Sequence, residues 1–237
     1  MFVMSLRNIL IATTLATFFS NQGLAQSTPC RDAAEESHHH VLLESSGMRV
    51  LLLELPRIAS TDSFCYASSY VYVVLSEGSS SLTAEGKGTF SRDWSGSETQ
   101  LIYEPQRQVI RNESGRTFRE VIVELPRVEP YDPLRDSLTS DMFPSDLGTV
   151  KPTWTVSFTR GGVKFSKVQL GAGDTFSVGG GRSLLIALTN VRLRNTQDGV
   201  SESLDVQAQD VSILGSSTVS RLTNESRAPA RFILIEY

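Results

Sequence analysis

Histidine is the side chain most often used as a base or a metal ligand near neutral pH, and this sequence has three, all contiguous: His38, His39 and His40. On an extended segment His38 and His40 share a face while His39 points away, so one metal ion would receive two imidazole ligands. Two interpretations stay open: a surface Cu, Ni or Zn site at His38 and His40, or a polar arm leading into the first strand. With every histidine in one tripeptide, no Ser-His-Asp arrangement can be assembled and no catalytic residue is assigned.

The two cysteines, Cys30 and Cys65, form the second candidate pair. In an oxidising compartment they could form a disulfide, which would hold the N-terminal arm and stabilise the fold by about 3 to 4 kcal/mol. Two unpaired thiols are the alternative. Catalytic cysteine chemistry needs a basic partner, and the sequence offers no histidine outside residues 38–40.

The N-terminus has the pattern of an export signal. Arg7 supplies a positive charge, residues 9–19 are apolar, and residues 23–25 (Gly-Leu-Ala) form a small-x-small cleavage pattern. The apolar stretch is shorter than the roughly 20 residues that span a bilayer, so we expect cleavage rather than an uncleaved anchor. Cys30 lies too far from the small residues for a lipoprotein. The sequence therefore predicts a periplasmic or extracellular protein with no membrane span after cleavage.

The overall composition is that of an ordinary globular protein. The 237 residues include 22 Lys and Arg against 26 Asp and Glu, a net charge of −4, and 40% hydrophobic side chains. No basic block offers an electrostatic footprint for nucleic acid. Long apolar runs are confined to the first twenty residues, which excludes a multi-span membrane protein.

An internal duplication organises the chain. The segment VIRNESGRTFREVIVELPR (109–127) matches the C-terminal SRLTNESRAPARFILIEY (220–237) at a shift of 112 residues. Two more matches keep the same order: 68–75 with 181–188 at a shift of 113, and 47–55 with 162–170 at a shift of 115. Ordered matches indicate two copies of one structural unit, and short loop insertions explain the drifting shift.

Each copy consists of short runs rich in Val, Ile, Leu, Tyr and Thr, bounded by Gly, Pro, Ser and Asn, which is typical of antiparallel β-structure. The unbroken apolar run 71–75 predicts a strand buried on both faces. Both copies carry Asn-Glu-Ser before their last strand, and a turn role for Asn112 and Asn224 explains this without glycosylation, which stays the alternative. The expected organisation is a signal peptide 1–25, an arm 26–37, a first unit 38–127, a Pro/Asp/Ser-rich linker 128–152 and a second unit 153–237.

The two copies together resemble a tandem cupin, a small double-sheet jelly-roll barrel repeated twice. HHHVLLESSGMRVLLLELP (38–56) is similar to the opening strands of cupins, SYVYVVLSEGSSSLT (69–83) to the strand pair around the first cupin motif, and QVIRNESGRTFREVIVELP (108–126) to the second motif and final strand. The second copy resembles them mainly through its match to the first. The resemblance implies an all-β bicupin with an intimate interface between its barrels and a pseudo-twofold axis relating them.

Cupins typically hold a divalent metal ion with a His-x-His and a Glu from the first motif and a His from the second. The resemblance places here, in that order, Phe64, Tyr66, Tyr70 and Gln108. Shifting the loop by one residue gives Ser63 and Cys65 instead of the first pair. In the second copy the corresponding positions fall near Ser177, Gly179, Ser183 and Ser220. Because these groups cannot replace imidazole toward such metal ions, we expect no cofactor.

A pocket in the first barrel would be lined by hydroxyl, amide and aromatic groups suited to a neutral polar ligand such as a sugar. The candidates are Tyr66, Tyr70, Tyr72 and Gln108. Alternatively, these side chains simply fill the barrel. The sequence carries no signal for an oligomeric state.

We therefore expect an exported, non-catalytic, metal-free bicupin-like protein that acts as a small-molecule binding or structural module. The alternative is a cupin-type enzyme: a metal-independent isomerase or epimerase using Tyr and Glu as acid and base, or a metal-dependent enzyme using the His38–His40 segment. A Tyr or Glu with a shifted pKa beside a partner would favour the enzyme. An aromatic cavity without titrating neighbours would favour the binding module.

Overall fold

The computed structural model describes residues 30–45, 48–104, 106–125, 153–160, 163–216 and 218–237. The expected signal peptide (1–25) and the expected linker (128–152) lie outside them. Within the described residues, regular structure consists of seventeen strands and one short 3-10 helix, so the expected all-β fold is confirmed. No helix in this part of the chain is long and apolar enough to cross a membrane.

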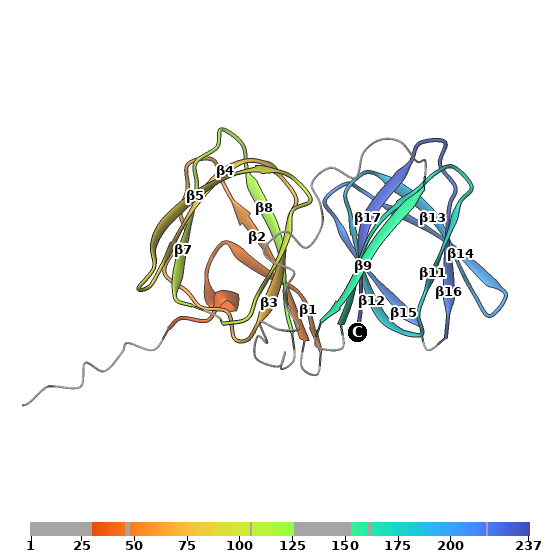
Figure 1. Cartoon of the computed structure of the whole chain (residues 1–237), viewed down its shortest axis with the longest axis horizontal. Coiled ribbons are helices and arrows are strands. Elements are labelled where there is room, and N and C mark those ends of the chain that lie inside the picture. The colour runs from red at the N-terminus through yellow and green to blue at the C-terminus, as the bar shows by residue number, and fades with distance from the viewer. Residues whose placement is uncertain (1–29, 46–47, 105, 126–152, 161–162, 217) are drawn as a thin grey trace, which may run out of the picture.

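The first barrel (Figure 1) is built from the short helix and the first eight strands. These are η1 (Ala33–Glu35), β1 (His39–Ser45), β2 (Met48–Leu55), β3 (Tyr70–Val74), β4 (Glu77–Ala84), β5 (Gly88–Ser95), β6 (Thr99–Ile102), β7 (Gln108–Asn112) and β8 (Phe118–Glu124). A five-stranded sheet, β1-β2-β8-β3-β6, faces a three-stranded sheet, β5-β4-β7. Two antiparallel sheets closed over one interior form a jelly-roll barrel.

The second barrel repeats this plan with the remaining strands. These are β9 (Trp154–Arg160), β10 (Val163–Leu170), β11 (Thr175–Val178), β12 (Gly181–Ala187), β13 (Val191–Gln197), β14 (Val200–Val206), β15 (Val211–Ser216), β16 (Ser220–Asn224) and β17 (Ala230–Glu236). A five-stranded sheet, β15-β12-β17-β10-β9, faces a four-stranded sheet, β11-β16-β13-β14.

The pairing registers reproduce all three sequence offsets. Arg49 pairs with Glu124 in the first barrel, and Lys164 pairs with Glu236 in the second. The shift from Arg49 to Lys164 is 115 residues, and the shift from Glu124 to Glu236 is 112. Tyr70 pairs with Glu124 and Ser183 with Glu236, which gives the shift of 113 for β3 and β12. The duplication read from the sequence is therefore a duplication of strand pairing, and each position in one barrel has a defined counterpart in the other.

The same Asn-centred turn closes both copies. The Asn112 side-chain amide donates to the backbone oxygens of Leu55 (3.0 Å) and Pro56 (3.0 Å), and Asn224 donates to Leu170 (3.0 Å) and Gly171 (3.1 Å). Both asparagines are buried, at 0% and 1% exposed. The predicted turn role is confirmed for both, because each amide is committed to hydrogen bonds that tie the turn to the barrel wall.

The two five-stranded sheets pack against each other across the molecule (Figure 1), so each is buried on both faces. In β2, Leu51 and Leu53 face the first barrel's interior, while Met48 and Val50 belong to a cluster shared with the second barrel. The second barrel's share of that cluster is Val163, Phe165, Leu184, Ile186, Ile233 and Ile235. The unbroken apolar run 71–75 has the same cause, since β3 alternates between the barrel interior and the interface.

Candidate functional site

The four residues that the resemblance places at the cupin metal-ligand positions meet inside the first barrel. Phe64 and Gln108 pair through two backbone hydrogen bonds of 3.1 and 2.9 Å, and the Phe64 and Tyr66 rings lie 5.2 Å apart. The Tyr66 and Tyr70 rings lie 4.1 Å apart, and the Tyr70 side chain is hydrogen-bonded to Gln108. All four side chains are buried, so the alignment that uses Phe64 and Tyr66, rather than exposed Ser63 and cross-linked Cys65, describes the interior.

These four residues do not fit a divalent metal ion. Phe64 offers no ligand atom. Burial raises the pKa of the Tyr66 and Tyr70 hydroxyls above the ordinary tyrosine value, by the larger amount at Tyr66, so neither side chain supplies a phenolate near neutral pH. The amide of Gln108 is engaged by Tyr70. No group of three or more His, Cys, Asp or Glu residues arranged to hold a metal occurs in the described part of the chain.

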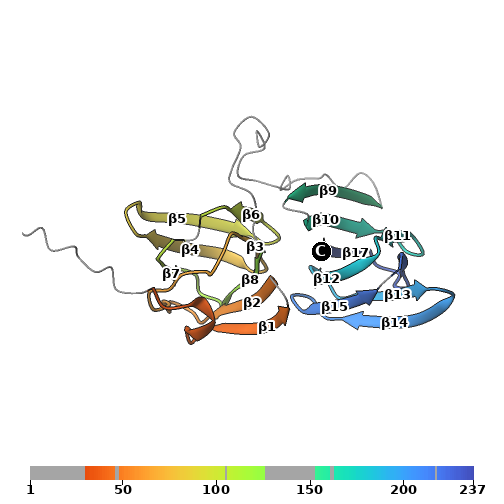
Figure 2. The ribbon, with the colours of Figure 1, turned by 90° about the horizontal axis from the view of Figure 1, so that it is seen from below.

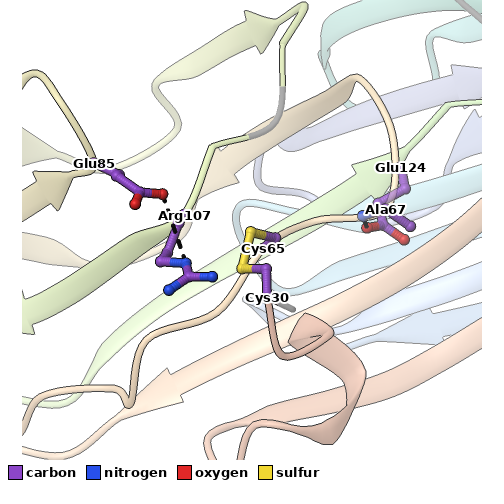
Figure 3. Close-up of a disulfide and its surroundings, with 6 residues drawn as sticks. All are labelled: Cys30, Cys65, Ala67, Glu85, Arg107 and Glu124. Atoms are coloured by element: carbon purple, nitrogen blue, oxygen red, sulfur yellow. Dashed lines mark hydrogen bonds and ion pairs between the residues drawn. A yellow bond between two sulfur atoms is a disulfide. The ribbon is translucent and has the colours of Figure 1, made fainter. Parts of the chain in front are cut away.

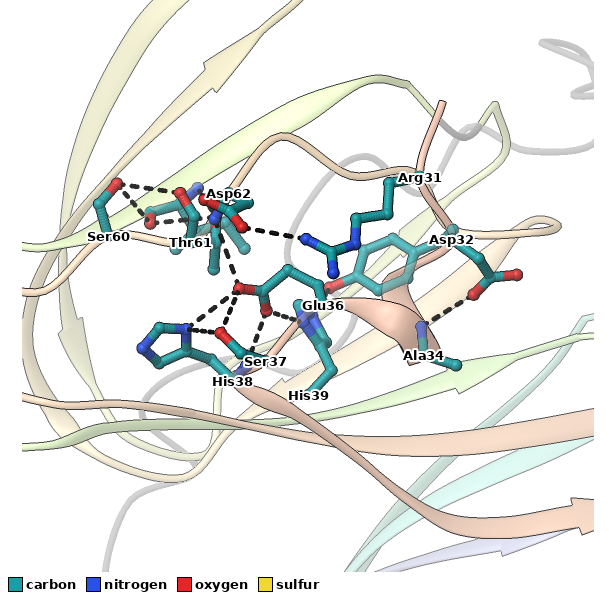
Figure 4. Close-up of polar contacts among 12 residues, drawn as sticks. Arg31, Asp32, Ala34, Glu36, Ser37, His38, His39, Ser60, Thr61 and Asp62 are labelled. Atoms are coloured by element: carbon teal, nitrogen blue, oxygen red, sulfur yellow. Dashed lines mark hydrogen bonds and ion pairs between the residues drawn. The ribbon is translucent and has the colours of Figure 1, made fainter. Parts of the chain in front are cut away.

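The histidine segment directs one ring into the barrel. His39 is 5% exposed, its Nδ1 lies 2.7 Å from Glu36 Oε2, and its Nε2 lies 3.3 Å from the Tyr66 hydroxyl. Burial lowers the pKa of His39, against the opposing effect of Glu36. Glu36 is buried too, yet its bonds with His38 and His39 outweigh that burial and lower its pKa. Figure 4 shows the Glu36 carboxylate between these two histidines.

His38 and His40, the pair considered for a surface metal site, contact different carboxylates. His38 Nδ1 lies 3.0 Å from Glu36 Oε1, whereas His40 Nε2 lies 3.9 Å from Glu54 Oε2. His38 precedes β1 and lies in a turn, so the two residues do not share one extended face. The segment instead joins the N-terminal arm to the barrel.

A disulfide between Cys30 and Cys65 holds the same arm (Figure 3), with the two Cα atoms 5.8 Å apart. Next to it, Arg49 donates to Asp32 Oδ1 at 2.7 Å and pairs with Glu124. Burial lowers the pKa of Arg49, but its bonds with Glu124 and Asp32 raise it by more. The disulfide and the Arg49–Asp32 ion pair thus fix the arm across this end of the barrel, and the Arg49–Glu124 pair ties β2 to β8.

Glu120 adds a buried acid to the interior. It lies on β8, is 6% exposed, and pairs through the backbone with Leu53 and Val74. Burial raises its pKa to about 8, and no hydrogen bond or charge from the described part of the chain offsets that effect. Its charge also contributes to raising the pKa of Tyr66 and Tyr70. Glu120 is therefore largely protonated at neutral pH and can donate or accept a hydrogen bond.

Tyr72, the fourth predicted lining residue, lies in a more open part of the interior. Its ring meets the Trp94 ring edge-on at 6.0 Å, and its hydroxyl donates to Gln100. Trp94 Nε1 donates to Ser80 Oγ at 2.7 Å, and the Arg92 guanidinium lies 4.5 Å from the Trp94 ring centre. Tyr72, Trp94 and Gln100 are partly exposed. These five residues are called the Trp94 patch below.

The second barrel has aliphatic side chains in place of four of the five Trp94-patch residues, and Ser212, which pairs with Leu185, in place of Gln100, which pairs with Tyr72. Ser80 pairs with Arg92 and with Asn112, whereas Leu193 pairs with Leu204 and with Asn224. The same registers match Trp94 with Val206 and Tyr72 with Leu185. The counterparts Leu185, Leu193, Leu204 and Val206 all belong to or pack against one apolar core.

The counterparts of these positions in the second barrel offer serine hydroxyls and no imidazole or carboxylate. Ser183 and Ser220 are buried, but Ser177 and Gly179 are exposed. Val178 pairs with Ser220 as Phe64 pairs with Gln108, so the interior position is Val178, one residue away from the expected Ser177. The sequence shift that relates β11 to the Phe64 segment differs from the shifts of the neighbouring strands. The position expected from the sequence was therefore one residue away from the interior one.

Sequence reasoning missed Trp94, Gln100 and Glu120. The segment 88–95 alternates so that Phe90, Arg92 and Trp94 share a face, which was an available signal. Glu120 was hidden because it stands beside the apolar triplet 121–123.

No family model matches the chain, and no curated protein matches it by sequence. Solved structures do match. A cupin 2 conserved barrel domain protein from Leptotrichia buccalis is 11% identical with a TM-score of 0.55, covering 88% of this chain and 91% of that one. An oxalate decarboxylase from Lactobacillus farciminis is 10% identical, with a TM-score of 0.55, covering 89% and 86%. A vicilin from Capsicum annuum is 10% identical, with a TM-score of 0.54, covering 80% and 75%. The fold is therefore the cupin fold in tandem, on which enzymes and non-enzymes are both found.

Proposed function

We propose that this tandem cupin-fold chain is an exported, non-catalytic protein whose first barrel binds a small neutral polar ligand of the sugar class at the Trp94 patch. The observation that carries the proposal is the contrast at matched positions. Trp94 and Tyr72 are partly exposed in the first barrel, while their counterparts Val206 and Leu185 are sealed in the core of the second. This contrast supports a site in the first barrel at which a ligand contacts Trp94 and Tyr72.

The chemistry of the Trp94 patch suits a hydroxylated ring. Two aromatic side chains offer flat apolar surface, and Gln100, Ser80 and Arg92 supply amide, hydroxyl and guanidinium groups for hydrogen bonds. Binding sites of this kind combine mainly apolar walls with a few oriented polar groups. The buried set Phe64, Tyr66, Tyr70 and Gln108 would support the patch from behind rather than contact the ligand.

Export is part of the proposal. The charged start, apolar stretch and small-residue pattern of residues 1–25 support it, and so does the disulfide between Cys30 and Cys65, because structural disulfides are typical of oxidising compartments. Detection of a mature N-terminus at residue 26 in the exported fraction is the expected result. A chain that keeps residues 1–25 and stays in the cytoplasm would contradict it.

Binding can be tested by saturation-transfer NMR against a panel of mono- and disaccharides, followed by calorimetry of the best ligand. Trp94→Val installs the side chain that the second barrel carries at the same position. We expect it to weaken binding about tenfold or more. Val206→Ala is the matched control, which loses core packing but keeps binding. Equal affinity of Trp94→Val and the wild type, or no sugar bound at all, would contradict the proposal.

A second candidate function is supported by Glu120. A buried carboxyl group with a raised pKa beside Tyr66 and Tyr70 is the arrangement expected of a metal-independent isomerase or epimerase that uses Glu and Tyr as acid and base. Glu120→Gln separates the two functions. A binding module keeps its sugar affinity in this variant and converts no sugar in either form. An enzyme keeps the affinity but loses turnover, and NMR would then show that the two epimers of the sugar no longer interconvert.

A further inference from the structure

A second site lies outside both barrel interiors, where the edges of the two five-stranded sheets meet. A pocket of about 280 Å³ is formed between β1 and β15, and Figure 2 shows these edge strands on the same side of the molecule. Its apolar lining is Leu42, Leu43, Leu52, Leu184, Val211 and Ile213. Leu42 is 39% exposed and Ile213 is 49% exposed, so the aliphatic lining reaches the surface.

The polar end of this pocket is built from both barrels. Arg119 Nη1 donates to Gln209 Oε1 at 3.0 Å, and Gln209 Nε2 donates to the backbone oxygen of Leu75 at 3.1 Å. Arg119 Nε lies 2.8 Å from Glu54 Oε1. Asp210 completes the polar lining. These contacts fix donors and acceptors at one end of an otherwise aliphatic pocket.

Local charge selects the head group that such a pocket accepts. The positive charge of Arg119 is already balanced by Glu54, and Asp210 adds a negative charge to the lining. A carboxylate head group would therefore face net negative charge, whereas a neutral group would not. A hydroxyl, carbonyl or amide can exchange hydrogen bonds with the Arg119, Gln209 and Asp210 side chains.

The pseudo-equivalent edge has a different character. Leu52 pairs with Val121, and its counterpart Lys167 pairs with Ile233. The Lys167 ammonium donates to Ser97 Oγ at 2.9 Å across the barrel boundary. Where one edge carries an aliphatic side chain that lines the pocket, the other therefore carries a cation that bridges the barrels.

We infer that the pocket between β1 and β15 binds a small neutral amphipathic molecule, with its aliphatic chain against the leucines and its polar head at Arg119, Gln209 and Asp210. This site is independent of the Trp94 patch. A neutral occupant is favoured by the charge balance. A short aliphatic occupant is favoured by the size of the pocket, which is just below the usual range for small-molecule sites.

The test uses 1-octanol, octanoate and octylammonium as probes, titrated into the mature chain and followed by NMR chemical shifts. We expect saturable binding of 1-octanol at least about tenfold tighter than that of octanoate or octylammonium. Ile213→Trp places a bulky ring at the exposed rim and should weaken 1-octanol binding about tenfold. Val200→Trp, at a 72%-exposed position on β14, is the control and should bind normally.

Three outcomes would overturn the inference. Octanoate or octylammonium binding as tightly as 1-octanol would refute the selection of a neutral head group. Unchanged binding in Ile213→Trp, with its melting temperature preserved, would place the alcohol elsewhere. Self-association through β1 and β15 without alcohol uptake would make this edge a protein interface. Trp94→Val should leave 1-octanol binding intact, which separates failure at this pocket from failure of the sugar proposal.

Discussion

The two barrels share one framework but differ in what fills them. Their strands pair in matching registers, and their closing turns are held by matching asparagines. The second barrel's interior is mainly an aliphatic and phenylalanine core, with Ser183 and Ser220 buried beside it. The first contains tyrosines, Gln108, Glu120 and a buried His39–Glu36 pair. The duplicated framework thus supplies stability twice, while at matched positions the first copy has Tyr70, Gln108 and Glu120 and the second has Ser183, Ser220 and Phe232.

This difference explains how the first barrel can hold polar groups in its interior. Buried polar groups cost free energy unless they are hydrogen-bonded, and the second barrel has small serines at two of the matched positions and Phe232 in place of Glu120. Apolar packing between the sheets joins the two into one unit. The second barrel and the shared interface therefore stabilise a chain whose first barrel contains groups that a minimal core would omit.

The largest expected loss of stability tests the shared framework. Asn112→Ala and Asn224→Ala each remove a buried side chain that bonds several backbone groups, including Arg116 or Ala228 in the turn itself. Each should lower the free energy of unfolding by about 4 kcal/mol, because the freed backbone oxygens stay buried. Chemical denaturation measures both. A large loss in one variant and almost none in the other would show that the turns are not equivalent.

The next effect is confined to the first barrel, which alone carries a cross-linked arm among the described residues. The double variant Cys30→Ala/Cys65→Ala should lose about 3 kcal/mol, since the disulfide closes a separation of 35 residues in the unfolded chain. Dithiothreitol should destabilise the wild type by a similar amount and leave the double variant unchanged. Equal melting temperatures with and without reductant would show that the disulfide contributes nothing.

The framework could be predicted from the sequence because it depends on local patterns. The sequence match between residues 109–127 and 220–237 predicted corresponding strands in the two copies. The Asn-Glu-Ser turns marked where the last strand of each copy begins. The Cys30–Cys65 pair followed from the expected export, and the interior placement of Phe64, Tyr66 and Tyr70 followed from alignment to the cupin motifs. These features need only short-range periodicity and the order of the blocks.

The site could be predicted only in part, because the sequence does not show which face of a strand turns inward. On β8 the more apolar face, Val121 and Val123, belongs to the interface with the second barrel, so the face with Glu120 lines the interior. Sequence reasoning assigns the apolar face to the nearest core and therefore overlooks Glu120. Trp94 was overlooked for a related reason. The other residues of β5 are exposed, so the sequence pattern of this strand predicts a solvent-facing hairpin rather than part of the interior.

The last prediction depends on pH and concerns Glu120, whose counterpart in the second barrel is Phe232. The pKa of Glu120 is about 8 in the folded chain against an ordinary value of 4.5. The folded state therefore binds the proton more tightly, and stability falls as pH rises from 4.5 to about 8, when the buried group must ionise. Tyr66 and Tyr70 remain protonated there because burial raises their pKa.

Glu120→Gln should flatten this fall. Relative to its own stability at acidic pH, the variant should be about 5 kcal/mol more stable than the wild type at alkaline pH, since the pKa of Glu120 rises from 4.5 to about 8 and each pKa unit corresponds to about 1.4 kcal/mol. Denaturation across that pH range measures the difference, and Glu202→Gln, at an exposed position on β14, should follow the wild-type profile. The titration of His39 affects all three proteins equally and cancels in the comparison. Parallel profiles for Glu120→Gln and the wild type would mean that Glu120 ionises freely, and the first barrel would then be as hydrated as its surface rather than a dry interior like that of the second.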